Sequence, residues 1–237
     1  MAASRVAEIL AAAWAIRPDG SGMPAALAEL CVHALPVSGA GLCLMTEAGP
    51  AGTVTATDAR ALELEELQFT LGEGPCVDAS LTGRPVLQPD LARTAPGRWP
   101  AFAQGASAAG LSAVFAFPLR VGAIRVGVLD LYRDVVGVLS PGELTDALCF
   151  ADAATALMLH LQARAAGTDL PLDSLAVLDN RAEVHQATGV ISVHAGVSLV
   201  EALVLLRARA YADQRPVGNL ARDVLEGVVH FRPDMDD

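Results

Sequence analysis

The sequence predicts an α+β protein in which an antiparallel sheet flanked by helices is followed by an all-α unit of three helices. Over roughly the first two thirds of the chain, segments with helical spacing of apolar residues precede and interrupt short alternating segments. The alternating segments come in pairs joined by Gly-containing turns, which is typical of antiparallel hairpins. After residue 166, every remaining segment has a helical pattern. These observations together predict a sheet domain and a separate helical unit.

The composition excludes several classes of protein. The chain has 237 residues and a net charge of −11, and all sixteen basic residues are arginine. Such an acidic balance argues against a protein that coats nucleic acid in general, because phosphate attraction needs positive charge. No uninterrupted apolar run approaches the roughly 20 residues that cross a bilayer, and the N-terminus lacks the pattern of a cleavable signal. We therefore expect a cytoplasmic protein with no membrane partner.

The first part of the chain, residues 1–166, is predicted to form the helix-flanked sheet. Its first elements are helix, helix, strand, strand and helix, at residues 4–16, 23–35, 39–49, 51–58 and 59–69. Pro24 suits the first turn of the second helix. The paired strands are indicated by their Gly-Pro-Ala-Gly link and by the alternation of Val54 and Ala56 with threonines.

The same part continues with a second pair of strands within residues 112–134, joined by a turn at 121–123. The first of these strands places Ala113, Phe115 and Phe117 on one face. In the second strand, one face is expected to hold Val126, Val128, Asp130 and Tyr132. Between the two strand pairs the sequence predicts, in order, a tight loop at 72–75, a short helix ending at Gly83, an extended segment at 85–87 and a short helix within 98–111.

A long helix is predicted to end this part of the chain. Ser140 and Glu143 form a capping-box pattern, and Pro141 fits the first helical position. The apolar stripe that follows continues for about six turns at 3.6 residues each. Gly167 is a candidate C-cap, so the sequence predicts a domain boundary near residues 166–171.

The second part, residues 171–232, is predicted to be a bundle of three helices, followed by an acidic tail at 233–237. Its first helix is expected from about 170 to 195, closed by Gly196, and its second from a Ser198–Glu201 capping box to about 212. The third helix follows Gly218-Asn219. Its inward residues are expected to be Leu220, Val224, Leu225 and Val228.

Catalytic and metal-binding motifs are not recognisable in the sequence. It contains no GxSxG, HExxH, phosphate-loop or dinucleotide-glycine pattern, so we do not expect an enzyme. The four cysteines have no CxxC spacing and are expected to be buried thiols, with neither a disulfide framework nor a metal site; they are Cys31, Cys43, Cys76 and Cys149. A helix start at Cys76 also allows the alternative of a lowered thiol pKa.

Two segments of the chain resemble known families. Residues from about 20 to 165 resemble a GAF domain of the kind found ahead of ANTAR domains, through the segments 72–91, 98–102 and 113–133. Residues 171–232 resemble an ANTAR domain. The positions that carry this second resemblance are Arg181, Val184, Gln186, Ala187, Gly189, Val190, Ile191, Gly196, Val197, Ser198, Glu201, Ala202, Leu205, Leu206, Arg207, Ala210, Leu220 and Ala221. The resemblance implies a sensory domain joined to an antiterminator that binds paired RNA hairpins in nascent transcripts as a homodimer.

The resemblance implies an RNA-binding face on the helical unit. Its expected members are Arg181, His185, Gln186, Thr188, Gly189, Arg207, Arg209 and Arg215. Arg181, His185 and Thr188 follow one another at i+4 and i+3 steps and are expected to share a polar face. Arginine both grips phosphate and stacks on unpaired bases. The family pattern usually has lysine at the position of Thr188, so the alternative is an adaptor that senses a ligand and binds a protein partner.

The resemblance also implies a small-molecule ligand, although the sequence identifies neither this ligand nor a cofactor. Five residues either line a ligand pocket or fill the core, with the core favoured: Cys76, Trp99, Phe115, Phe117 and Tyr132. We expect the homodimer contact along the helix at 141–165 and its continuation. That continuation carries Leu172, Leu175, Leu178 and Ala182 at coiled-coil spacing.

Overall fold

A five-stranded antiparallel sheet lies at the centre of the computed structural model, which describes residues 2–46, 49–166 and 182–231. The strand order is β2-β1-β5-β4-β3. The strands are β1 (Gly39–Thr46), β2 (Gly49–Ala56), β3 (Val86–Gln88), β4 (Ala113–Val121) and β5 (Ile124–Arg133). β1 pairs with β2 and β4 pairs with β5, which confirms the two predicted hairpins.

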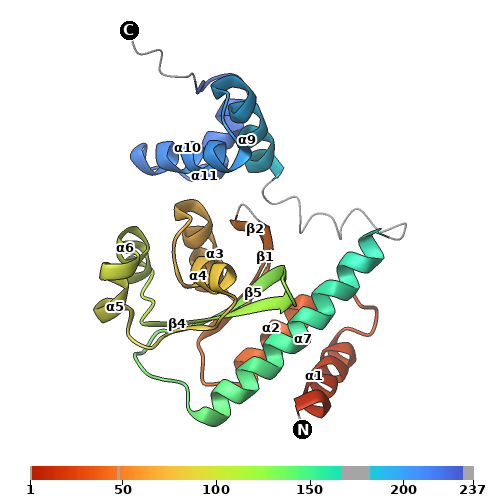
Figure 1. Ribbon diagram of the computed structural model, residues 1–237. Helices are drawn as coiled ribbons and strands as arrows, with labels where there is room; N and C mark the ends of the chain where they lie inside the picture. Colours follow the sequence, from red (N-terminus) through yellow and green to blue (C-terminus); the bar gives the residue numbers. More distant parts are fainter. Residues whose placement is uncertain (1, 47–48, 167–181, 232–237) are drawn as a thin grey trace.

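Two helices, α2 (Met23–Ala34) and α7 (Pro141–Ala166), cover one face of the sheet, and α1 (Ala2–Ile16) packs against these two helices (Figure 1). The core on this side includes Phe115 and Phe117 from β4 and Phe150 from α7. The predicted cap of α7 is confirmed. Ser140 Oγ accepts from Glu143 N at 3.3 Å, and Ser140 N donates to Glu143 Oε2 at 2.7 Å.

One helix of the described chain, at Pro141–Ala163, is long and apolar enough to cross a membrane by length and composition. The helix pair Glu183–Ala195 and Leu199–Ala212 passes the same test only if a 106° bend is ignored. Much of the apolar surface of α7 is buried against the sheet, where Ala147, Phe150 and Ala154 are at most 2 % exposed. Packing against the sheet therefore accounts for the apolar residues on that side of the helix.

Four shorter helices cover the opposite face (Figure 1): α3 (Ala59–Leu71), α4 (Pro75–Thr82), α5 (Leu91–Arg98) and α6 (Pro100–Ala108). Helix α5 was not predicted, because Pro96 and Gly97 near its end give the stretch the composition of a loop. Asp90 begins this helix by accepting from Arg93 N at 3.2 Å. The core between these helices and the sheet includes Leu64, Phe102 and Val128.

The predicted alternation along β5 holds only in part. Val128 and Tyr132 face α3–α6, whereas Leu129 and Leu131 face the other layer, as expected. Val126 was predicted to share the face of Val128 but packs in the other core. The pairing of β5 with β4 shifts register near the hairpin turn, and such an irregularity interrupts the two-residue alternation of faces.

Three helices form a C-terminal unit: α9 (Ala182–Ala195), α10 (Leu199–Ala212) and α11 (Val217–Leu225). The Ser198–Glu201 capping box is confirmed, and Gly196 follows α9 with a φ of +68°. Leu225 and Val228 were wrongly predicted to face inward, since they are 38 % and 68 % exposed. Helix α11 ends at Leu225, so the helical repeat that was used to predict an inward Val228 does not extend to that residue. The predicted first half of the α9 helix, with Arg181 and Leu172, Leu175 and Leu178, lies outside the described residues.

Candidate functional site

The C-terminal unit contacts the sheet domain through α3. Phe69, from α3, is 1 % exposed and packs in the apolar core of the C-terminal unit together with Leu206. The guanidinium carbon of Arg207 lies 5.3 Å from the centre of the Phe69 ring, within cation–π range. A Cβ atom at Gly72, which ends α3 with a φ of +66°, would come within 2.9 Å of Arg207. The glycine therefore leaves room for the arginine.

Two residues of the predicted RNA-binding face lie at this contact. Arg207 stacks on Phe69, and His185 Nε2 lies 3.2 Å from the backbone oxygen of Ala51 in β2. Gln186, by contrast, is exposed, and Gly189 is half-buried. In the structure, part of the predicted RNA-binding face is therefore held at the domain contact, and another part is exposed to solvent.

Thr188 does not belong to a polar face. Its side chain is 5 % exposed, and its hydroxyl donates to the backbone oxygen of Val184 at 2.7 Å. The expectation that Thr188 stands beside His185 on the surface is therefore wrong. Thr188 follows the buried Val184 by four residues and precedes the buried Ile191 by three, which places all three on one side of the helix.

The other arginines of the described C-terminal unit form ion pairs with acids. Arg209 contacts Asp213 at 2.7 Å and Arg215 contacts Asp223 at 2.6 Å. Arg222 similarly contacts Glu183 at 3.0 Å. Ion pairs at a protein surface contribute little stability, about 0–1 kcal/mol, so an anionic ligand can displace the acid at small cost.

The five predicted pocket residues do not surround one cavity. Phe115 and Phe117 lie in the core under α1, α2 and α7, whereas Cys76, Trp99 and Tyr132 lie in the core under α3–α6. All five are at most 3 % exposed. Their polar atoms anchor neighbouring helices: Trp99 Nε1 donates to Asp78 at 3.2 Å, and Tyr132 donates to Asp58, the N-cap of α3, at 2.9 Å. These residues therefore fill the two cores.

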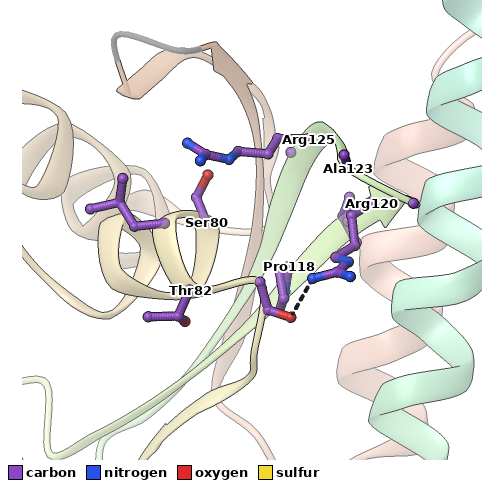
Figure 2. A pocket seen from close by; sticks show the side chains of 11 residues that line it. Ser80, Thr82, Pro118, Arg120, Ala123 and Arg125 are labelled. Atoms are coloured by element: carbon purple, nitrogen blue, oxygen red, sulfur yellow. Dashed lines mark hydrogen bonds between the residues drawn. The ribbon is translucent and has the colours of Figure 1, made fainter.

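A surface cleft of about 170 Å³ lies between the end of α4 and the β4–β5 turn (Figure 2). Arg120 reaches across it and donates to the backbone oxygen of Gly83 at 3.2 Å. A second cleft of about 180 Å³ shares Ser80 and Arg125 with the first and extends to Arg207. None of the five predicted pocket residues lines either cleft.

The most unusual group in the described residues is buried between the sheet and α3–α4. We call it the thiol–carboxylate cluster, and its members are Cys43, Glu65, Cys76 and Asp130. One donor atom from each residue, a sulfur or a carboxylate oxygen, lies within 4.8 Å of the other three. Each residue is at most 3 % exposed. The two sulfur atoms are 3.3 Å apart.

Four elements bring the cluster together. Cys43 comes from β1 and Asp130 from the neighbouring β5, while Glu65 comes from α3 and Cys76 from the first turn of α4. A Cβ atom at Gly41 would collide with the Glu65 carboxylate, so the glycine opens the space that this side chain occupies. Cys76 N donates to the Gln68 side chain at 2.7 Å, which ties the start of α4 to α3.

Burial dominates the electrostatics of the cluster. It raises the pKa of Asp130 to about 7, and the neighbouring side chains of Cys76, Glu65 and Gln68 partly oppose the rise. Burial, together with Cys43 and the nearby acids, also raises the pKa of Cys76 well above its usual value. The alternative of a thiol activated by the helix start is therefore wrong for Cys76.

The sequence did not reveal this group, because its members are 22, 11 and 54 positions apart along the chain. One signal was available. Asp130 was predicted to share one face of a strand with Val126, Val128 and Tyr132, and an acid at such a position needs a partner when that face is buried. Two thiols and two carboxyls form a donor set that suits a divalent cation of intermediate softness.

Comparison with known proteins gives a family for the sheet domain. A family model described as GAF domain matches residues 21–147. A solved domain of a two-component sensor histidine kinase protein from Sinorhizobium meliloti 1021 superposes with a TM-score of 0.50 at 19% identity, covering 60% of this chain and 92% of that domain. An N-acylhomoserine lactone dependent LuxR family transcription factor from Burkholderia cenocepacia has a TM-score of 0.49 at 17% identity, covering 67% and 96%. No curated protein matches the chain.

Proposed function

The chain belongs to the GAF domain family, and from this premise we propose that it is a sensory regulator of transcription antitermination whose C-terminal unit binds RNA hairpins. The GAF domain suggests signal sensing. The RNA-binding role rests on the resemblance of the C-terminal helices to an ANTAR domain and on their compatible three-helix arrangement. In this proposal the protein acts by binding and catalyses no reaction.

One observation carries the proposal: the sensory domain holds part of the expected RNA-binding face. Arg207 is stacked on Phe69 of α3, and His185 contacts the β2 backbone. A signal that undocks the C-terminal unit from α3 and β2 would therefore release both side chains. Gln186 and Arg209 are exposed in the docked arrangement, and they would supply a first, weaker contact with RNA.

A second candidate function is binding of a protein partner, and an exposed apolar stripe on α10 favours it. Val200, Val204 and Tyr211 are 54 %, 57 % and 57 % exposed. Their spacing of four and seven residues places them on one side of the helix. An apolar stripe of this kind is typical of a helix that packs against another protein.

We further propose that the protein is a homodimer, as the resemblance implies. Leu148 and Leu159 lie on the side of α7 away from the sheet and are 42 % and 36 % exposed. Their separation of eleven residues, about three helical turns, aligns them on one face. Two copies joined along α7 would bring two C-terminal units to a paired hairpin target, which raises avidity.

The test measures binding of the full chain to a pool of RNAs that carry two adjacent hairpins, over a series of salt concentrations. We expect binding that weakens with salt, with a logarithmic slope of about 0.7 for each contact to single-stranded phosphates. Arg209→Ala should weaken binding and lower the slope. The control is Arg93→Ala, which removes another exposed, ion-paired arginine, this one from α5.

Phe69→Ala should strengthen binding, because it frees Arg207 from the domain contact. Salt-insensitive binding, or an equal loss with Arg93→Ala, would contradict the RNA-binding role. In that case, loss of a co-purifying protein with Val204→Glu would support the adaptor function instead.

A further inference from the structure

The proposed function gives no role to the thiol–carboxylate cluster, although the cluster gathers four buried side chains that can each bind a metal ion. Buried acids are normally matched by a cation or by hydrogen-bond donors, since an unmatched charge in the protein interior is costly. Neither oxygen of Asp130 accepts a hydrogen bond of good geometry in the described residues, although the side chain is 0 % exposed. No described arginine forms an ion pair with it. Within the described residues, the buried Asp130 carboxyl therefore has no basic side chain as its counterion.

We propose that the thiol–carboxylate cluster is a binding site for one divalent cation of the zinc class. Cysteine sulfur and carboxylate oxygen are both zinc ligands, and the four donors here match the ligand number of a closed zinc site. Its formal charge, with both thiols and both carboxyls ionised, equals that of a site with four cysteine ligands. Thiolate ligands favour zinc over magnesium or calcium, which prefer oxygen.

The geometry requires only small movements. Zinc–sulfur bonds of about 2.3 Å and zinc–oxygen bonds of about 2.0–2.2 Å place tetrahedral ligand atoms roughly 3–4 Å apart. The sulfurs of Cys43 and Cys76 are 3.3 Å apart, and all four donor atoms lie within 4.8 Å. When the cation enters, the two thiols and any protonated carboxyl release their protons to solvent.

Neighbouring residues are arranged to keep the donors in place. Gly41 leaves the space that the Glu65 carboxylate occupies, and the Gln68 amide group beside Asp130 holds the backbone of Cys76. A Cβ atom at Gly127 would collide with the backbone oxygen of Cys43, so a second glycine permits the close approach of β1 and β5. These supports belong to β1, β5 and α3, which also supply three of the four donors.

The site lies close to the contact with the C-terminal unit. Glu65 and Phe69 are four residues apart on α3, so one turn of helix separates a proposed ligand from the residue that docks the C-terminal unit. The cation-binding inference itself does not depend on RNA binding. It stands or fails on measurements of the metal alone.

The test uses the reduced full-length protein after removal of metal with a chelator. Titration with cobalt(II), a spectroscopic substitute for zinc, should give one equivalent bound per chain with a thiolate-to-cobalt charge-transfer band. X-ray absorption of the zinc-loaded protein should show two sulfur ligands at about 2.3 Å and oxygen ligands at about 2.0–2.2 Å. This second measurement needs no variant, so it remains decisive if a variant fails to fold.

Variants then assign the ligands. Cys43→Ser and Asp130→Asn should each weaken zinc binding by at least about 10–100-fold, the loss typical when even a supporting residue of a metal site is changed. Gly41→Ala should also weaken binding, because it displaces Glu65 while both thiols remain. Cys31→Ala, which removes a buried thiol from the opposite face of the sheet, is the matched control and should bind zinc normally.

Three results would overturn the proposal. One is the lack of a thiolate band and of bound zinc in the reduced protein. Another is a set of ligands in the absorption spectrum that contains no sulfur. The third is unchanged zinc affinity in a folded Cys43→Ser variant, which would place the bound metal elsewhere.

Discussion

The guanidinium of Arg207 stacks on the ring of Phe69 at 5.3 Å, and this contact joins the C-terminal unit to the sensory domain. Phe69 belongs to α3 by sequence, yet its buried side chain lies in the core of α9–α11. Helix α3 therefore serves two cores, because Leu64 on the same helix packs against the sheet. Changes in α3 can affect both parts of the protein.

Replacing Phe69 should undock the C-terminal unit. A buried Phe→Ala change typically costs about 3–5 kcal/mol, and here the loss falls on the domain contact as well as on α3. We expect faster hydrogen exchange and faster proteolysis in α10 of Phe69→Ala. Leu62→Ala is the control, since Leu62 lies on the same helix but is 45 % exposed. Unchanged exchange in α10 would mean that Phe69 does not hold the unit.

Leu206 should be a main source of stability in the C-terminal unit. It is 0 % exposed, so Leu206→Ala should destabilise the unit by about 2–5 kcal/mol. Val204→Ala, on the exposed side of the same helix, should change stability by no more than about 0.5 kcal/mol. The free energies are measured by hydrogen exchange of α10 amides. Equal effects of the two changes would contradict the helical phase in the structure.

Thr188→Lys should destabilise the protein, even though lysine is usual at this position in the family that the C-terminal sequence resembles. The side chain of Thr188 is buried and bonded to Val184, so a lysine there must bury its charge or displace α9. Gln186→Lys, two residues earlier and exposed, should fold normally and increase the salt dependence of RNA binding. Thermal unfolding compares the two variants. A Thr188→Lys protein as stable as the unaltered one would show that α9 is rotated from its described position.

Stability should fall at alkaline pH through Cys31. Burial raises the pKa of this thiol from 9.0 to about 12, so above pH 9 the unfolded chain releases a proton that the folded chain retains. The stabilisation that comes from the protonated Cys31 thiol is therefore complete below pH 9 and is lost as the pH rises towards 12. In Cys31→Ala, unfolding free energies measured by urea between pH 8 and about pH 10.5 should therefore fall less steeply. Parallel slopes in the two proteins would show that Cys31 does not titrate in this way.

The local elements of the fold follow from neighbouring residues and were predicted from the sequence. Hairpins require alternation and a turn within a few positions, and the caps of α7 and α10 require a serine and a glutamate three residues apart. Helix α5 was missed because Pro96 and Gly97 oppose a helix locally, while Asp90 and the packing of Leu91 and Ala95 support it. The sheet order also agrees with the predicted fold class.

The thiol–carboxylate cluster and the docking of Arg207 depended on the tertiary structure. Cys43, Glu65 and Asp130 have no informative spacing along the chain, and they meet only because β1, β5 and α3 pack together. Arg207 likewise contacts α3 across a long separation in sequence. Local patterns record which face of an element is apolar. They do not record which distant residue a buried or docked side chain contacts. That contact is decided when elements far apart in the sequence pack together, so the residues next to it in the sequence carry no sign of it.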